Sequence, residues 1–260
     1  MLERVLALKE RLRAGGTVIG GWLGFNDPAL IELMARIGFD YLLIDTEHTP
    51  WGLERLQSAL MAFNGSPTVP MVRVPWNDQV MIKQALDLGV EGIMAPMVRT
   101  TDEVRALVAA CKYPPAGIRG FAPRRASGYF RDIDAYMAAA NDAVFVMPQV
   151  EDIATLGELD AYLAVPGIDA VCVGPNDLSG TMGLLRQTQH PDVRAAVDRI
   201  YAAAKARDLP VCLGVTVPTE AMPALAEQGV RMLLATADLD LLVRGATAAL
   251  ASARQALTQS

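Results

Sequence analysis

The 260-residue sequence is poor in cysteine, histidine and basic charge. It contains three cysteines and two histidines, and its formal net charge is −6. The cysteines are far apart in apolar surroundings, which predicts reduced, buried thiols rather than disulfides or a zinc site. A net negative chain has no general positive field to attract nucleic acid or an anionic membrane surface. We therefore expect neither as a partner.

The sequence also lacks a long hydrophobic run. Nowhere do 18 apolar residues follow one another, and the first 16 residues alternate charge with leucine instead of forming a secretory leader. These absences predict a cytoplasmic protein with no membrane partner. Hydrophobic residues make up 52% of the chain and charged residues 20%, a balance that excludes disorder and permits a large core.

Eight short aliphatic segments alternate with longer amphipathic ones along the chain. The predicted strands are Thr17–Leu23, Asp40–Ile44, Thr68–Val74, Gly92–Pro96, Ala143–Val150, Ile168–Gly174, Pro210–Val215 and Val230–Ala235. The predicted helices cover residues 2–13, 27–37, 51–63, 78–88, 101–112, 152–164, 192–207, 218–228 and 239–256. Eight strands, each followed by a helix, predict an α/β fold, a single (β/α)₈ TIM barrel over residues 1–260. An open doubly wound sheet is less favoured because no G-x-G-x-x-G follows the first strand.

Two long segments interrupt the repeat. Residues 113–131 are rich in glycine, proline and arginine, and residues 178–191 extend the connection after the sixth strand. Barrels tolerate such insertions in loops, and the loops at the carboxyl ends of the strands carry the chemistry. Arg119, Arg124 and Arg125 in the first segment could contact a distal part of a substrate, a neighbouring subunit or only solvent, and solvent is the default expectation.

Two carboxylates follow adjacent predicted strands. Glu151 comes after the fifth strand and Asp177 after the sixth, so both should face one point of the barrel rim. Facing carboxylates repel each other unless a cation or a shared proton intervenes. Oxygen ligands without a nearby cysteine favour a hard divalent ion such as Mg²⁺ or Mn²⁺. The structural alternative is that each residue only caps a following helix.

A histidine and an arginine lie near the same rim. His48 follows the second strand beside Asp45 and Glu47, which favours either a general base or a structural histidine. Arg73 lies within the apolar third strand, where a guanidinium needs an anionic partner. That partner could be Glu47 in a structural pair, a substrate carboxylate or a developing oxyanion. No glycine-rich phosphate site follows strands seven and eight, so carboxylates are the favoured anionic substrates.

Six separate segments resemble one known family. The segments are DYLLIDTEHTP (40–50), MVRVPWND with IKQALDLG (71–89), PPAGIRGFAPRRAS (114–127), PQVED (148–152), GPNDLSGTMG (174–183) and QHPDV (189–193). Together they are similar to the 4-hydroxy-2-oxoheptanedioate aldolases, the HpcH/HpaI class II pyruvate aldolases. The resemblance implies metal-dependent aldol cleavage at pyruvate, with Mg²⁺, Mn²⁺ or Co²⁺ as cofactor. It also implies a homo-oligomer, a hexamer or a trimer, whose subunits exchange their last helix.

The resemblance also implies roles for individual residues. Glu151 and Asp177 would hold the metal, Arg73 the keto oxygen of pyruvate, and Asp45 would belong to the surrounding polar shell. The implied acid–base residue is His48, with Asp87 as its dyad partner. The implied substrate-binding residues are Arg73, Arg125, Gln149, Gly174, Pro175, Asn176 and Asp177. Asp87 is assigned by the resemblance alone, because it falls near the end of a predicted helix.

The chemistry implied by the family agrees with the residue inventory. A cation and Arg73 would offset the charge of an enolate, and a base would take the proton of the substrate hydroxyl. The four lysines all fall in predicted helices, so a Schiff-base aldolase is not expected. We therefore predict a divalent-metal-dependent aldolase that cleaves 4-hydroxy-2-oxo acids to pyruvate and an aldehyde. A citrate-lyase-like enzyme acting on a thioester and a non-catalytic carboxylate-binding barrel are the alternatives.

Overall fold

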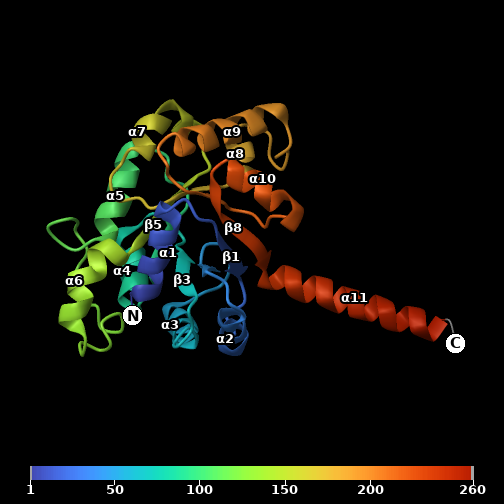
Figure 1. Ribbon diagram of the computed structural model, residues 1–260, viewed down its shortest axis with the longest axis horizontal. Helices are drawn as coiled ribbons and strands as arrows, with labels where there is room; N and C mark the ends of the chain where they lie inside the picture. Colours follow the sequence, from blue (N-terminus) through green and yellow to red (C-terminus); the bar gives the residue numbers. More distant parts are fainter. Residues whose placement is uncertain (1, 259–260) are drawn as a thin grey trace.

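The computed structural model describes residues 2–258, and its eight strands form a closed parallel barrel (Figure 1). Each strand pairs with its neighbours in chain order, and the eighth pairs with the first. The strands are β1 (Val18–Leu23), β2 (Tyr41–Asp45), β3 (Val69–Arg73), β4 (Gly92–Ala95), β5 (Phe145–Val150), β6 (Val171–Val173), β7 (Val211–Leu213) and β8 (Val230–Ala237). The predicted (β/α)₈ barrel is confirmed.

Helices connect the strands and surround most of the barrel (Figure 1). They are α1 (Glu3–Arg13), α2 (Pro28–Ile37), α3 (Leu53–Ala62), α4 (Gln79–Asp87), α5 (Thr101–Cys111), α6 (Ile133–Ala143), η1 (Ile153–Gly157), α7 (Leu159–Leu163), α8 (Pro175–Thr181), α9 (Pro191–Lys205), η2 (Thr219–Ala221), α10 (Met222–Glu227) and α11 (Asp238–Thr258). None of these helices is long and apolar enough to cross a membrane.

The strands are buried on both faces. In β2, Tyr41 and Leu43 belong to the cluster inside the barrel, whereas Leu42 and Ile44 pack against the surrounding helices. A strand with an apolar environment on both sides has a continuous apolar sequence rather than an alternating one. This explains why these segments were recognisable as short aliphatic runs.

The leading helix α1 closes one end of the barrel. Its apolar residues Val5, Leu8 and Leu12 belong to the same cluster as interior residues such as Met71 and Phe145. The opposite end, where the strands finish, therefore remains accessible for a site.

The structure corrects several sequence-based boundaries. Helix α6 lies in a region for which no helix was predicted, and its last residue, Ala143, was expected to begin the fifth strand. Helix α8 lies partly in the segment expected to be a loop. The helices predicted at 152–164 and 218–228 are each divided into a 3₁₀ turn and a short α-helix. Apart from α6, these elements have at most seven residues, too few for helical periodicity to separate them from loops.

The last helix leaves the barrel instead of packing beside β8. Figure 1 shows α11 extending away from the body of the molecule. Asp238, its first residue, is the only buried residue that the structure describes in this helix. The outer layer is incomplete at this seam, because Ile19 in β1 is 42% exposed although it lies within a closed barrel.

We predict that Gly20→Ala destabilises the barrel. A Cβ at Gly20 would lie 2.4–2.6 Å from ring carbons of Tyr41 inside the barrel. Overpacking of this kind costs about 1–3 kcal/mol, so the urea midpoint should fall. Gly157→Ala is the control, because nothing lies within 4 Å of its added methyl group. Equal midpoints for the two variants would contradict the prediction.

Candidate active site at the carboxyl end of the barrel

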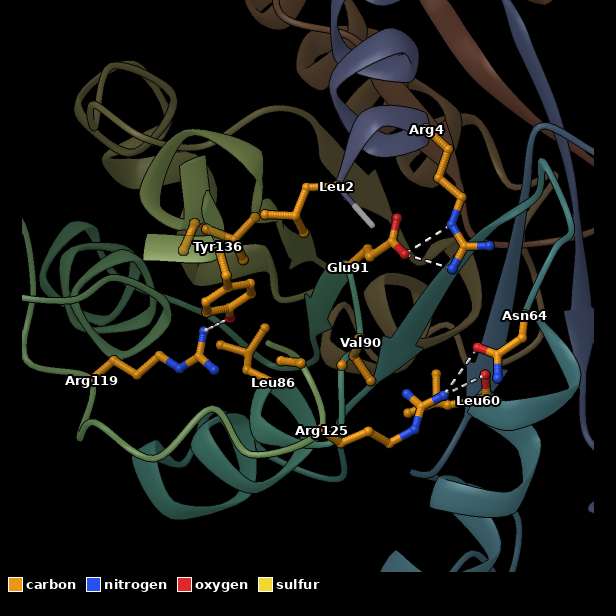
Figure 2. Close-up of a pocket in the computed structure, with 14 residues that line it drawn as sticks. Leu2, Arg4, Leu60, Asn64, Leu86, Val90, Glu91, Arg119, Arg125 and Tyr136 are labelled. Atoms are coloured by element: carbon orange, nitrogen blue, oxygen red, sulfur yellow. Dashed lines mark hydrogen bonds and ion pairs between the residues drawn. The ribbon is translucent and has the colours of Figure 1, made fainter. Parts of the chain in front are cut away.

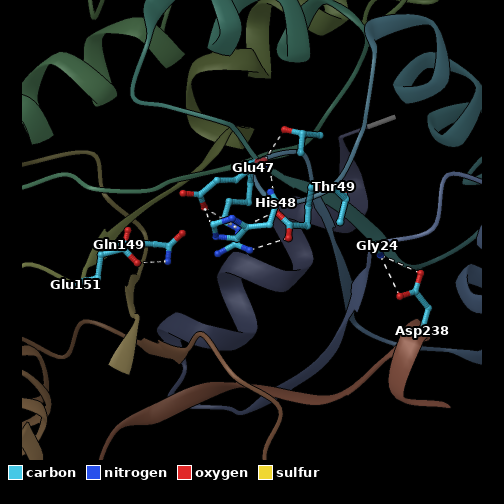
Figure 3. A network of polar contacts seen from close by, with 10 residues as sticks. Gly24, Glu47, His48, Thr49, Gln149, Glu151 and Asp238 are labelled. Carbon is cyan, nitrogen blue, oxygen red and sulfur yellow. Dashed lines mark hydrogen bonds and ion pairs between the residues drawn. The ribbon is translucent and has the colours of Figure 1, made fainter. Parts of the chain in front are cut away.

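Polar residues lie where β2, β3, β5 and β6 end, and Figure 3 shows Glu47 and His48 after β2 and Gln149 and Glu151 at the end of β5. Parallel strands in a closed barrel bring their carboxyl ends to one rim, which explains why residues far apart in the sequence meet there. The residues at this rim are Asp45, Glu47, His48, Arg73, Gln149, Glu151, Gly174, Pro175, Asn176 and Asp177.

Arg73 is held rigidly at the end of β3. Its Nε and one Nη donate to the two oxygens of Asp45 at 3.0 and 2.8 Å, and its Nε lies 3.2 Å from Glu47 Oε2. The ring of Trp22 lies 4.5 Å from the guanidinium carbon. Burial opposes the charge of Arg73, but the bonds to Asp45 outweigh it and raise the pKa above its ordinary value. The arginine therefore remains a fixed cation.

Asp45 also shapes the turn that carries His48. Its Oδ1 accepts hydrogen bonds from the backbone N–H groups of Glu47 and His48 at 3.1 and 3.3 Å. The Thr49 hydroxyl donates to the Asp45 carbonyl. The His48 side chain is exposed, and its Nε2 lies 3.5 Å from Glu47 Oε2. The turn thus holds an exposed imidazole beside Glu47 at the carboxyl end of the barrel.

Glu151 is the buried carboxylate of the site. Its Oε1 accepts from the backbone N–H of Met97 at 2.7 Å, and its Oε2 accepts from Gln149 Nε2 at 2.8 Å. Met97 has a φ of 51°, a conformation rare outside glycine, which directs its N–H at the carboxylate. Gly174 leaves room for the group, since a Cβ there would lie 2.4 Å from Glu151 Oε2.

The charges around Glu151 favour a cation. Burial raises the pKa of Glu151 to about 7, and the negative charges of Asp177 and Glu47 raise it further. The hydrogen bond from Met97 N–H and the charge of Arg73 act in the opposite direction and lower it. The pKa of Glu47 is also raised by burial, although Arg73 opposes this. Gln149 Oε1 is buried and has no hydrogen-bond donor in the described chain, whereas Glu47 Oε2 accepts no hydrogen bond but is ion-paired with Arg73. A bound cation with its water would offset these costs.

Asp177 lies in the first turn of α8 and is exposed. The capping alternative for the two carboxylates is wrong. Gly174 is the N-cap of α8. Asp152 rather than Glu151 is the N-cap of η1, and its side chain accepts from the N–H of Ala154. The two carboxylates are therefore not occupied as helix caps.

The donor set fits a hard divalent ion that retains open positions. Within residues 2–258, no three His, Cys, Asp or Glu side chains converge as a ready-made metal site. Glu151 and Asp177 would be the protein ligands, and the remaining positions would be left to water and substrate oxygens. The uncompensated burial of Glu151 is the feature of this chain that fits such an ion.

Asp87 and Arg125 lie at the opposite end of the barrel from the site in their own chain. Helices run antiparallel to the strands, so the end of α4 carries Asp87 to the amino end of the barrel. Asp87 Oδ1 accepts from Arg119 at 2.8 Å. Arg125 donates to the carbonyls of Leu88 and Leu60 at 2.6 and 3.0 Å, which end α4 and α3. Asp87 and Arg125 therefore lie at the amino end of the barrel, whereas His48 of the same chain lies at the carboxyl end.

These contacts correct the default expectation for the arginine-rich loop. Arg119 is buried, stacks on Tyr113 and donates to Tyr136, so it does not simply face solvent. Arg125 is partly buried, and Figure 2 shows it in a pocket that also contains Arg4 and Glu91. Arg119 and Arg125 thus anchor the loop to the barrel, whereas Arg124 is exposed to solvent in this chain, as expected.

Sequence reasoning missed Trp22 and Met97. The stacking of Trp22 on Arg73 joins β1 to β3, and nothing in either local pattern indicates the contact. Met97 acts through its backbone, so its residue type gives no signal.

Comparison with known proteins identifies the family. A family model described as HpcH/HpaI aldolase/citrate lyase matches residues 19–244. The chain belongs to this family. It is 43% identical over 249 residues to a 4-hydroxy-2-oxo-heptane-1,7-dioate aldolase of Salmonella dublin, covering 93% of this chain and 92% of that protein.

Solved structures of the HpcH/HpaI family share the fold. A HpcH/HpaI aldolase/citrate lyase family protein from Burkholderia cenocepacia J2315 has a TM-score of 0.90 and 34% identity, covering 95% of this chain and 99% of that one. A HpcH/HpaI aldolase from Desulfitobacterium hafniense DCB-2 has a TM-score of 0.87 and 29% identity, covering 95% and 96%. The predicted resemblance and the predicted class, a carbon–carbon lyase of the aldolase type, are confirmed.

We predict that the ionisation of Glu151 makes the metal-free protein less stable as pH rises. Its pKa of about 7 exceeds the ordinary 4.5, so the folded state binds more protons than the unfolded state between these values. Stability should therefore fall from about pH 5 to pH 8, and Glu151→Gln should reduce this fall by on the order of 1–3 kcal/mol. Urea unfolding with chelator present measures it. Glu54→Gln, on the exposed face of α3, should keep the wild-type slope.

Proposed function

We propose that this HpcH/HpaI family member is a divalent-metal-dependent aldolase that cleaves 4-hydroxy-2-oxo acids to pyruvate and an aldehyde. The observation that carries the proposal is the burial of Glu151 among other carboxylates, with no cation paired to it among the described residues. The name of the Salmonella dublin relative supports a 4-hydroxy-2-oxo acid as the substrate class.

The proposed metal would be held by Glu151 and Asp177. When bound, a divalent cation would polarise the 2-keto group and offset the negative charge that develops on cleavage. The backbone N–H groups of Asn176 and Asp177, in the first turn of α8, would bind the substrate carboxylate beside Glu151.

Arg73 would bind the keto oxygen of the substrate. Its Nε and one Nη are bound by Asp45, whereas the other Nη donates no hydrogen bond within the described residues. A donor that is already fixed by Asp45 and Trp22 needs little reorganisation when charge appears on the keto oxygen. The enolate of pyruvate is the species that this arrangement would stabilise.

His48 would take the proton of the substrate's 4-hydroxyl group. Loss of this proton breaks the bond between carbons 3 and 4, releases the aldehyde and leaves the electron pair on the pyruvate enolate. Protonation of carbon 3 then gives pyruvate. The exposed imidazole at the rim is accessible to a hydroxyl group, and Glu47 at 3.5 Å can orient it. None of the four lysines lies at a strand carboxyl end, so the chain offers no amine for a Schiff base there.

We predict that cleavage depends on the metal and on both carboxylates. Chelator should abolish pyruvate release from a 4-hydroxy-2-oxo acid, and Mn²⁺ should restore it. Glu151→Gln and Asp177→Asn should each lower kcat/KM by at least about 100-fold, because the cation would lose a charged ligand. Glu220→Gln, exposed on η2, is the control. Full activity in metal-free buffer would contradict the proposal.

Two measurements separate the alternatives. Exchange of pyruvate methyl protons with deuterated solvent, followed by NMR with Mg²⁺ present, reports enolate formation without knowledge of the aldehyde. The absence of exchange favours a non-catalytic carboxylate-binding barrel. Because the family model also names citrate lyase, titration calorimetry should compare pyruvate with an acetyl thioester. Preferential binding of the thioester would favour the citrate-lyase-like reaction.

We also propose that subunits assemble by exchanging α11. The helix carries an apolar face formed by Leu239, Leu242, Val243 and Leu250, all at least 53% exposed. The exposed apolar residues Ile19, Leu33 and Ile37 lie on β1 and α2, beside the seam that α11 leaves uncovered. A helix from a second copy would cover this seam and bury its own apolar face. In such an assembly, Asp87 and Arg125 could approach a neighbouring subunit's site.

We predict that Leu242→Glu weakens this assembly. Burial of a leucine stabilises an interface by about 1.5–3 kcal/mol per copy, and a charge in its place adds a desolvation cost. Light scattering after size-exclusion chromatography should show a lower mass at equal concentration. Ser252→Glu, on the opposite face of α11, should keep the wild-type mass. A monomeric wild-type chain at micromolar concentration would reject the exchange.

A further inference from the structure

A buried carboxylate at the root of α11 holds a loop of the active-site rim. Asp238 is 4% exposed, and its oxygens accept from the backbone N–H of Gly24 at 3.0 and 2.9 Å and from that of Phe25 at 2.8 Å (Figure 3). The same carboxylate accepts the N–H of Leu239 at 2.8 Å. No lysine or arginine pairs with it among the described residues. Backbone amides alone therefore offset the charge of Asp238.

These bonds reach further than a helix cap requires. A capping carboxylate satisfies N–H groups of its own first turn. Asp238 instead binds two amides that lie more than 200 positions earlier in the chain, in the loop that follows β1. Bonds from a charged acceptor to two adjacent N–H groups fix the position of that loop more tightly than neutral bonds would.

The loop held by Asp238 supports the turn that carries His48. Asn26 Nδ2 donates to the carbonyl of Pro50 at 3.3 Å, two residues after His48. A Cβ at Gly24 would lie 3.5 Å from Asp238 Oδ1 and 3.6 Å from Thr49 Cγ2, so Gly24 lies between the two. The contacts run from Asp238 through residues 24–26 to residues 48–50.

We propose that Asp238 is a positioning residue for the reaction and acts through the 24–26 loop on the turn that presents His48. This inference rests on the proposed function. Asp238 touches neither Glu151 nor Arg73. It would therefore position the imidazole of His48 without contacting the residues proposed to bind the metal and the keto oxygen. Because Asp238 begins α11, the helix proposed to seat on a second copy and the turn of His48 share one anchor.

Asp238→Asn in the full chain tests the proposal, with Asp240→Asn as the matched control. Asp240 is an exposed carboxylate in the same helical turn, and its side chain binds neither Gly24 nor Phe25. We expect Asp238→Asn to lower kcat about tenfold, because a small displacement of a base is costly, and to change KM by less than about twofold. Asp238→Ala should lower kcat further. Asp240→Asn should match the wild type.

A second readout does not depend on activity. The chain has two histidines, so ¹³C-labelled histidine gives two imidazole Cε1 signals, and His190 serves as an internal reference. The His48 signal should shift or broaden in Asp238→Asn, and the His190 signal should not. Asn26→Ala, which removes the side-chain link to Pro50 from a surface loop, should move the same signal even if Asp238 variants fold poorly.

Three results would overturn the inference. The first is a kcat for Asp238→Asn equal to that of Asp240→Asn. The second is a His48 signal that neither Asp238→Asn nor Asn26→Ala moves. The third is a loss of kcat that disappears at higher protein concentration, which would assign Asp238 to assembly alone. An inactive wild-type chain would reject the proposed function, whereas the His48 signal would still test the positioning.

Discussion

The uncompensated negative charge of Glu151 is the constraint on which the site depends. A buried carboxylate is costly, and here two donors, Gln149 and the N–H of Met97, hold it in place without neutralising it. The nearest opposite charge, Arg73, is already bound by Asp45. The rim therefore fits the cation proposed for it, and the position of the Glu151 carboxylate is set by its own hydrogen bonds. Preorganisation of this kind lets the site respond to charge that develops on a substrate.

The barrel separates the chemistry of its two ends. Helix α1 fills the amino end of the barrel interior with apolar side chains, and Glu47, Glu151, Asp177 and His48 lie at the carboxyl end. Asp87, Arg119 and Arg125 lie at the amino end, where Arg119 binds Asp87 and Arg125 binds helix carbonyls. The two groups therefore do not meet within one chain. The exposed apolar surface near Ile19 is the surface that a second copy would cover in the proposed assembly.

The last helix, α11, begins at the active-site rim and extends away from the barrel seam that it leaves uncovered (Figure 1). Apart from Asp238, the residues of α11 whose burial the structure describes are exposed, whereas Asp238 is buried and binds the rim loop after β1. A change in the position of α11 would therefore act on this loop through Asp238. Asp238 therefore links the turn that carries His48 to the helix proposed to exchange between subunits.

The amino-acid sequence alone determined the eightfold alternation, the strand ends and the residues placed at them, including Glu151, Arg73 and His48. It could do so because two-sided burial leaves a continuous apolar run, and because parallel strands in a barrel end at one rim. It did not indicate the stacking of Trp22, the backbone donor of Met97, the burial of Arg119 or the short helix α6. Those features depend on which side chains and amides meet across distant segments. Only the tertiary structure decided them, because closure of the barrel sets distances that no local pattern encodes.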